Sequence, residues 1–140
     1  MPNLSMYFGA SVEHLVVSKL LEEEREVFLP VVDDHGVDIL VKSKPGAPDA
    51  WQELRVKSLR EGGLFAAINC PNPRANYWFV FYVKQHDTVW LVNSLDFVRL
   101  ASQNRPDCKN ANKYSLSLAT TKNLRQAMKQ YIITDFSKLP

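Results

Sequence analysis

The stretch 51–59 alternates strictly between two kinds of position, and this pattern limits the fold more than any overall property does. Its central residues form two sets, Gln52, Leu54 and Val56 against Glu53, Arg55 and Lys57. Successive side chains of a β-strand point to opposite faces of the sheet, so one set faces a core and the other is polar. The sequence therefore predicts a strand here, within a sheet that is covered on the side of Leu54.

The remaining elements follow from periodicity and turn residues. A helix over 9–24 is indicated by Val12, Leu15, Val16 and Leu20 at helical spacing, although the glutamates at its end suit a helix C-terminus poorly. Apolar runs predict strands over 27–32, 37–41, 77–83 and 88–92 and a short one over 114–118, whereas the short apolar run 64–68, between a Gly-Gly pair and two prolines, is not assigned to an element. The first two of these strands flank a turn and should form a hairpin. Two further helices are expected, one capped by Ser94 that extends through Leu100 and one capped by Thr121 that runs to about 131. Together these elements give a mixed α/β layer domain.

Size and composition favour one folded domain over residues 1–140, with a core at about 9–102 and a basic extension over 103–140. Hydrophobic residues make up 46% and charged residues 23%, which is ordinary for a globular chain. We expect no membrane span, since no apolar run reaches about 18–20 residues. Cys70 and Cys108 lack the spacing of a structural zinc site. Reduced thiols and the lack of a signal-like N-terminus favour a cytoplasmic protein.

Charge is distributed unevenly along the chain. Residues 1–40 hold 2 basic and 8 acidic side chains, whereas residues 101–140 hold 7 basic and 2 acidic ones. A basic C-terminal third can follow a phosphate backbone, and an unevenly charged solvated surface is the alternative. The candidate nucleic-acid contacts are Arg55, Lys113, Lys122, Arg125 and Lys129, of which Lys122, Arg125 and Lys129 are spaced to share one helix face.

Three residues stand out as candidates for chemistry. Glu13 borders the apolar stripe of the first predicted helix, where a carboxylate is costly without a partner. Asp38 opens an apolar strand directly after a glycine turn, and Lys57 lies on the polar face of the strand 51–59. Each has an ordinary alternative: a rim salt bridge for Glu13, a strand-end position for Asp38 and an exposed strand position for Lys57.

Taken together, these residues resemble the PD-(D/E)xK nuclease superfamily, which has a restriction-endonuclease-like fold. The resemblance rests on a helix acid, the hairpin segment Gly-Val-Asp-Ile-Leu-Val at 36–41 and the strand segment Arg-Val-Lys-Ser at 55–58, and it extends over about 9–100. It implies a mixed sheet of about five strands flanked by helices. It also implies DNA as substrate and metal-dependent phosphodiester hydrolysis. By this resemblance, Glu13 and Asp38 would hold Mg²⁺ or Mn²⁺, and Lys57 would orient or activate the attacking water.

The sequence departs from the family pattern at Arg55, where the family has an acid or glutamine. A guanidinium carries no lone pair for a cation and stays charged. Glu53, two residues earlier on the same face, is then the candidate replacement ligand. The alternative is a catalytically inactive module of the same fold that binds DNA or a protein partner. The resemblance also suggests a homodimer or a partner subunit, since many relatives act in that form.

Overall fold

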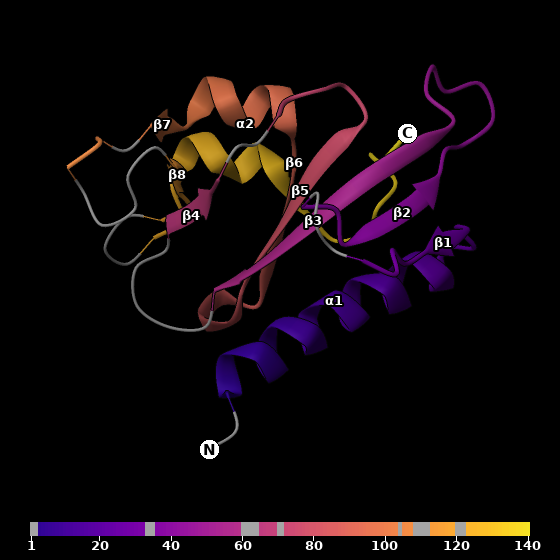
Figure 1. Cartoon of the computed structure of the whole chain (residues 1–140), viewed down its shortest axis with the longest axis horizontal. Helices are drawn as coiled ribbons and strands as arrows, with labels where there is room; N and C mark the ends of the chain where they lie inside the picture. The colour runs from indigo at the N-terminus through magenta and orange to yellow at the C-terminus, as the bar shows by residue number, and fades with distance from the viewer. Residues whose placement is uncertain are drawn as a thin grey trace.

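The structure of the protein is a computed structural model that describes residues 3–32, 36–59, 65–69, 72–103, 105–107, 113–119 and 123–140. A six-stranded mixed sheet runs through it in the order β1-β2-β3-β5-β6-β9 (Figure 1). Its strands are β1 (Val27–Phe28), β2 (Ile39–Lys42), β3 (Trp51–Leu59), β5 (Tyr77–Val83), β6 (Thr88–Asn93) and β9 (Ile132–Ile133). β3 and β5 are parallel, and the other neighbours pair antiparallel. The predicted α/β class is confirmed, with six strands in place of about five.

One face of this sheet is covered by the helix α1 (Leu4–Glu22), which lies along β3 in Figure 1. Val12, Val16 and Leu20 are buried and recur every four residues, so they form one row on the helix. Val16 and Leu20 belong to an apolar cluster completed from the sheet and the C-terminal segment by Ile39, Val41, Leu54, Val80, Leu91, Phe136 and Leu139. The predicted burial of Leu54 on this side of β3 is confirmed.

The other face of the sheet carries a second apolar cluster. The helix α2 (Ser94–Leu100) packs there through Phe97, whose ring centroid lies 4.9 Å from that of Phe79 in an edge-on arrangement. A second antiparallel sheet and two 3₁₀ helices complete the fold: β4 (Phe65–Ile68), β7 (Ser102–Gln103), β8 (Tyr114–Ser117), η1 (Lys84–His86) and η2 (Gln126–Tyr131). Alternation along β3 therefore directs Glu53, Arg55 and Lys57 toward this second face.

The first helix begins earlier than the sequence predicts. Asn3 caps it, since its side-chain oxygen accepts hydrogen bonds from the backbone N–H groups of Ser5 and Met6 at 3.1 and 3.4 Å. Leu15 was expected in the buried stripe but is 39% exposed, because it lies beside the row formed by Val12 and Val16 and not on it. The expectation for Leu15 was wrong.

The first hairpin is present, with Val27 opposite Val41 and Phe28 opposite Leu40. β1 is shorter than the predicted strand over 27–32, and Pro30 gives a physical reason because proline has no N–H to donate to a ladder. Strands over 51–59 and 77–83 have the predicted bounds. No helix in the described ranges combines the length and hydropathy that a membrane span requires.

The C-terminal third differs most from expectation. Thr121, the predicted cap of a last α-helix, lies outside the described residues, and the structure has the short 3₁₀ helix η2 where that helix was expected to end. The stretch 103–140, expected as an extension beyond the core, supplies buried side chains to both clusters, namely Leu116, Leu118, Met128, Phe136 and Leu139. Apolar side chains in this stretch thus pack against the main sheet.

Candidate functional site

The site lies where β2 begins, opposite Leu54, and β3 continues beyond it. In the described part of the chain, β2 pairs with Trp51–Leu54 and goes no further, whereas β3 extends to Leu59. We call the segment Arg55–Leu59, on the side facing β2, the open edge of β3. At its start, the N–H of Asp38 donates to the carbonyl of Leu54 at 2.8 Å. Asp38 therefore lies at the point where the ladder between the two strands ends.

The carboxylate of Asp38 lies on the open edge of β3. Its Oδ2 accepts a hydrogen bond of 2.7 Å from the backbone N–H of Val56. This N–H lies beyond the last pair of the β2–β3 ladder, so a side-chain oxygen takes the place that a neighbouring strand's carbonyl would occupy. A charge-assisted bond of this kind fixes the orientation of the carboxylate.

Glu13 lies on α1, at about the same level of β3, on the face of the sheet that α1 covers. A Cβ built on Gly9 lies 3.8 Å from Oγ of Ser58, and from there α1 runs toward Leu54, against which Val16 clusters. Four residues of helix rise about 6 Å, which is close to two residues of strand. Glu13 is therefore near the level of Val56. It is half-buried, at the border of the apolar row of α1.

Lys57 lies in a cluster of positive charges on the second face. It is half-buried, and burial lowers the pKa of its ammonium below the ordinary value of 10.5, with further lowering by the charges of Arg55 and then Lys113. Lys113 immediately precedes β8, so the second sheet brings it within electrostatic reach of β3. An amine with a lowered pKa is neutral more often, and so accepts a proton more readily, than an ordinary lysine.

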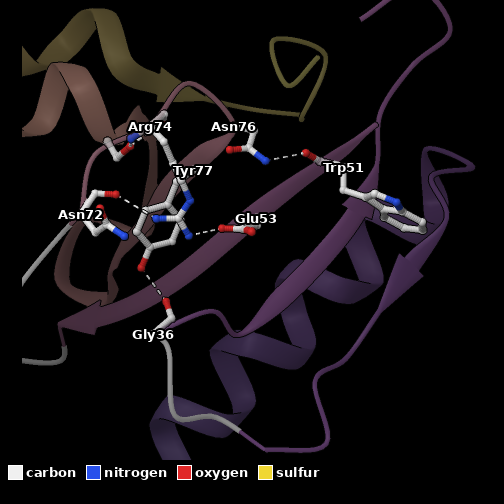
Figure 2. Close-up of polar contacts among 8 residues, drawn as sticks. Gly36, Trp51, Glu53, Asn72, Arg74, Asn76 and Tyr77 are labelled. Carbon is white, nitrogen blue, oxygen red and sulfur yellow. Dashed lines mark hydrogen bonds and ion pairs between the residues drawn. The ribbon is translucent and has the colours of Figure 1, made fainter. Parts of the chain in front are cut away.

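Arg55 is packed against the backbone that leads to Asp38. A Cβ built on Gly36 would lie 3.1 Å from Nη1 of Arg55 and 3.2 Å from the hydroxyl oxygen of Tyr77. That hydroxyl donates to the carbonyl of Gly36 at 2.6 Å, as Figure 2 shows. Burial raises the pKa of Tyr77, while the charge and hydrogen bond of Arg55 act in the opposite direction. Arg55 and Tyr77 thus contact the backbone segment that leads to Asp38.

Glu53 is paired with a different residue. Its Oε2 forms an ion pair and hydrogen bond with Arg74, whose guanidinium carbon also lies 4.2 Å from the ring centroid of Tyr77 (Figure 2). The backbone of Arg74 is fixed by Ser94, which accepts from its N–H at 2.9 Å and donates to its carbonyl at 2.8 Å. A guanidinium on this carboxylate competes with the predicted role of Glu53 as a metal ligand.

Glu13 and Asp38 are carboxylates, which is the type of donor that a magnesium ion takes. Mg²⁺ takes carboxylate oxygens, needs one or two from the protein and retains several waters. Within the described ranges no group of three or more His, Cys, Asp or Glu side chains gathers as a metal cluster. Glu53, the third predicted ligand, is held by Arg74. The fit therefore rests on two carboxylates.

The predicted basic helix face is not formed by the residues that can be placed. Arg125 has an extended backbone, with φ −59° and ψ 127°, and only precedes η2, in which Lys129 lies. Helix-face spacing does not apply to an extended residue, so the prediction that these two side chains share a helix face was wrong. Lys122, the third member, lies outside the described residues.

Sequence reasoning missed Gly36, Arg74 and Tyr77 as parts of the site. Gly36 was recognised only as a turn residue, and its φ of +71° is consistent with that. Tyr77 appeared as one aromatic residue among many in a buried strand. Ser94, predicted to cap α2, instead holds Arg74, while the neighbouring Asn93 caps the helix through a 3.0 Å bond from Leu95. None of these contacts is local in sequence except the cap.

A cavity of about 300 Å³ lies away from these residues. It is formed by α1, the start of β6 and the C-terminal segment, with Leu15, Lys19, Val89 and Phe136 among its lining. The polar cluster at the open edge of β3 contributes no side chain to it. Hydrogen bonds and charges converge at the polar cluster, whereas the lining of the cavity is mainly apolar.

Comparison with known proteins gives a fold relationship. No protein-family model and no curated protein sequence matches the chain. Among solved structures, the fold is similar to that of a bacterial homing endonuclease, I-Ssp6803I, with a TM-score of 0.59 and 12% sequence identity. The match covers 89% of this chain and 83% of the endonuclease chain. The chain therefore has a nuclease-like fold, in which the open edge of β3 is the candidate site.

Proposed function

We propose that the protein hydrolyses phosphodiester bonds of DNA with a divalent cation, at the open edge of β3, as a member of the PD-(D/E)xK superfamily. One observation supports this most: the carboxylate of Asp38 is fixed on Val56 one residue from Lys57, whose pKa is lowered by burial and by positive neighbours. Such a pairing of an oriented carboxylate with a lysine of altered acidity suits water activation. The nuclease-like fold agrees with this function.

In this proposal each residue of the site has a separate role. Glu13 and Asp38 would hold Mg²⁺ or Mn²⁺, which when bound acidifies a water and polarises the phosphate. Lys57, in its neutral form, accepts the proton of the attacking water at Nζ. Arg55 and Lys113, which share the positive cluster with Lys57, attract and orient the phosphate group. The second face of the sheet, covered by α2 and β8, partly excludes water from this cluster.

The test is cleavage of supercoiled plasmid and of linear duplex DNA by the whole protein with Mg²⁺, with Mn²⁺ or with EDTA. We expect nicked or linear product with either metal and none with EDTA. Intact DNA in both metals, from protein that is folded by circular dichroism, would contradict the proposed activity. Plasmid is the better first substrate because it offers many sequences to an enzyme of unknown preference.

A second candidate, DNA binding without cleavage, is favoured by Arg55 at the position where the family has an acid or glutamine. In this case the positive cluster would hold a phosphate with no metal beside it. Affinity for duplex DNA should then fall roughly tenfold to a hundredfold between about 50 and about 200 mM salt, since phosphate contacts release counterions. An inactive wild type that gains cleavage in Arg55→Gln would identify a disabled site.

Lys113 is predicted to tune the pH dependence of cleavage. Its positive charge helps to keep the pKa of Lys57 low, so Lys113→Gln should raise that pKa. The rising limb of the pH–rate profile, which reports loss of the Lys57 proton, should move to higher pH. The matched control is Lys138→Gln, because the Lys138 amine donates to the carbonyl of Gln130 in the C-terminal segment. Equal midpoints in Lys113→Gln and wild type would contradict the assignment.

A further inference from the structure

The contact between Tyr77 and Gly36 joins two parts of the chain that are 41 residues apart. Tyr77 is buried at the first position of β5, and its hydroxyl donates to the carbonyl of Gly36 at 2.6 Å. Gly36 has a φ of +71°, at which a side chain would be strained, and a Cβ at this position would lie only 3.1 Å from Nη1 of Arg55. The backbone at Gly36 is therefore held closely against Tyr77 and Arg55.

Gly36 lies only two residues before Asp38. The regular ladder of β2 starts at Ile39, so the path of the chain from Gly36 to Asp38 depends on individual contacts. Among these contacts are the Tyr77 hydroxyl on Gly36, the Asp38 N–H on Leu54 and the Val56 N–H on the Asp38 carboxylate. Loss of the hydrogen bond from Tyr77 removes one restraint on the backbone before Asp38. The carboxylate of Asp38 can then change its position on the open edge of β3.

The ring of Tyr77 is itself contacted on its face. The guanidinium of Arg74 lies over its ring, and Arg74 is held by Glu53 and, through its backbone, by Ser94. Figure 2 shows Arg74, Tyr77, Glu53 and Gly36 in this arrangement. A network of hydrogen bonds and a ring contact of this kind keeps the hydroxyl at one place. The ring is therefore a fixed support and not a mobile side chain.

We propose that Tyr77 is a positioning residue, which through its hydrogen bond to Gly36 fixes the carboxylate of Asp38 on Val56. Arg55, packed on the same glycine, is part of this support, which explains how an arginine is accommodated beside the acids. The role of Tyr77 in cleavage rests on the proposed function. The structural part, which is the coupling of Tyr77 to Asp38, does not require the protein to cut DNA.

The backbone amide of Val56 reports the position of the Asp38 carboxylate directly. Hydrogen exchange at this amide, followed by NMR, is compared between wild type, Tyr77→Phe and Tyr82→Phe. Tyr82 is a matched control because it is in the same strand and its hydroxyl bonds Asp87 at an exposed turn. We expect exchange at Val56 to become about fivefold to tenfold faster in Tyr77→Phe only, as for the loss of one hydrogen bond. Unchanged exchange would overturn the proposal.

Single-turnover cleavage and DNA affinity supply the second readout. Tyr77→Phe should lower the rate about tenfold with the same affinity for DNA, since a misplaced carboxylate slows the reaction and not the binding. An active protein whose rate is unchanged by Tyr77→Phe would overturn the positioning role. If the wild type cuts no DNA, the proposed function fails, and the exchange of Val56 still decides whether Tyr77 positions Asp38.

Discussion

Asp38→Asn is expected to lower the metal-dependent rate of DNA cleavage by at least about a thousandfold while the protein stays folded. The amide oxygen of asparagine can still accept the hydrogen bond from Val56, so the local backbone keeps its partner. The negative charge that a divalent cation needs is removed. The measurement is single-turnover cleavage with Mg²⁺, together with thermal unfolding of the same protein.

Two further variants separate charge from structure at this position. Asp38→Ala should be equally inactive and also less stable by about 1 kcal/mol, because the N–H of Val56 loses its partner. Asp96→Asn is the matched control, since Asp96 is a carboxylate on α2 paired with the exposed Arg99. It should cleave as the wild type does. Activity retained in Asp38→Asn would remove Asp38 from the site.

The second large effect is expected at Lys57. Lys57→Met should slow cleavage by about a hundredfold to ten-thousandfold, the usual contribution of a positioned proton-transfer group. Lys57→Arg separates two roles: a guanidinium keeps the positive charge but does not accept a proton at neutral pH. Loss of activity in both variants indicates proton transfer at Nζ. Full activity in Lys57→Arg would contradict proton transfer and leave an electrostatic role.

Lys57→Met should also make the protein more stable at neutral pH. The folded state lowers the pKa of Lys57 below 10.5, so between the two pKa values the unfolded chain binds more protons and stability rises with pH. At neutral pH the buried charge therefore costs stability, which methionine removes. We expect a melting temperature about 1–3 °C higher, a small effect for a half-exposed group.

The pH dependence of this gain checks its cause. The advantage of Lys57→Met should be largest at neutral pH and shrink as the pH rises through the folded pKa of Lys57, because wild-type Lys57 then loses its charge. Lys138→Met, at an exposed position of the C-terminal segment, is the control and should give no such pH-dependent gain. A gain that is constant with pH would indicate better packing of methionine instead of relief from charge.

Much of the fold could be predicted from the sequence because the patterns that indicate it are local. The alternation over 51–59 predicted both the bounds of β3 and the faces of Leu54 and Lys57, and the aromatic run over 77–83 predicted β5. A strand's period depends only on neighbouring residues. The end of the chain was less readable. Apolar residues such as Met128 and Phe136 are buried only because the sheet provides a surface to pack against. No local sequence pattern indicates that packing.

Part of the candidate site could be located from the sequence for the same reason. Asp38 and Lys57 follow motifs within a few residues of sequence, and the structure places both at β3. The partners that decide their chemistry come from far away: Tyr77 is 41 residues from Gly36, and Arg74 is 21 from Glu53. The local sequence around Glu53 therefore does not reveal its ion pair with Arg74. It shows only a glutamate at the spacing expected of a metal ligand.

We propose that Glu13, on α1, and Asp38, just before β2, hold one cation at the open edge of β3. Fe²⁺ with ascorbate and peroxide tests it most directly, because radicals formed at a bound iron cut the nearby backbone, and mass spectrometry maps the cuts. The account predicts cuts near Glu13, Asp38 and Val56 together, suppressed by excess Mg²⁺ and absent in Asp38→Asn. No cuts, or cuts near only one of these positions, would contradict it.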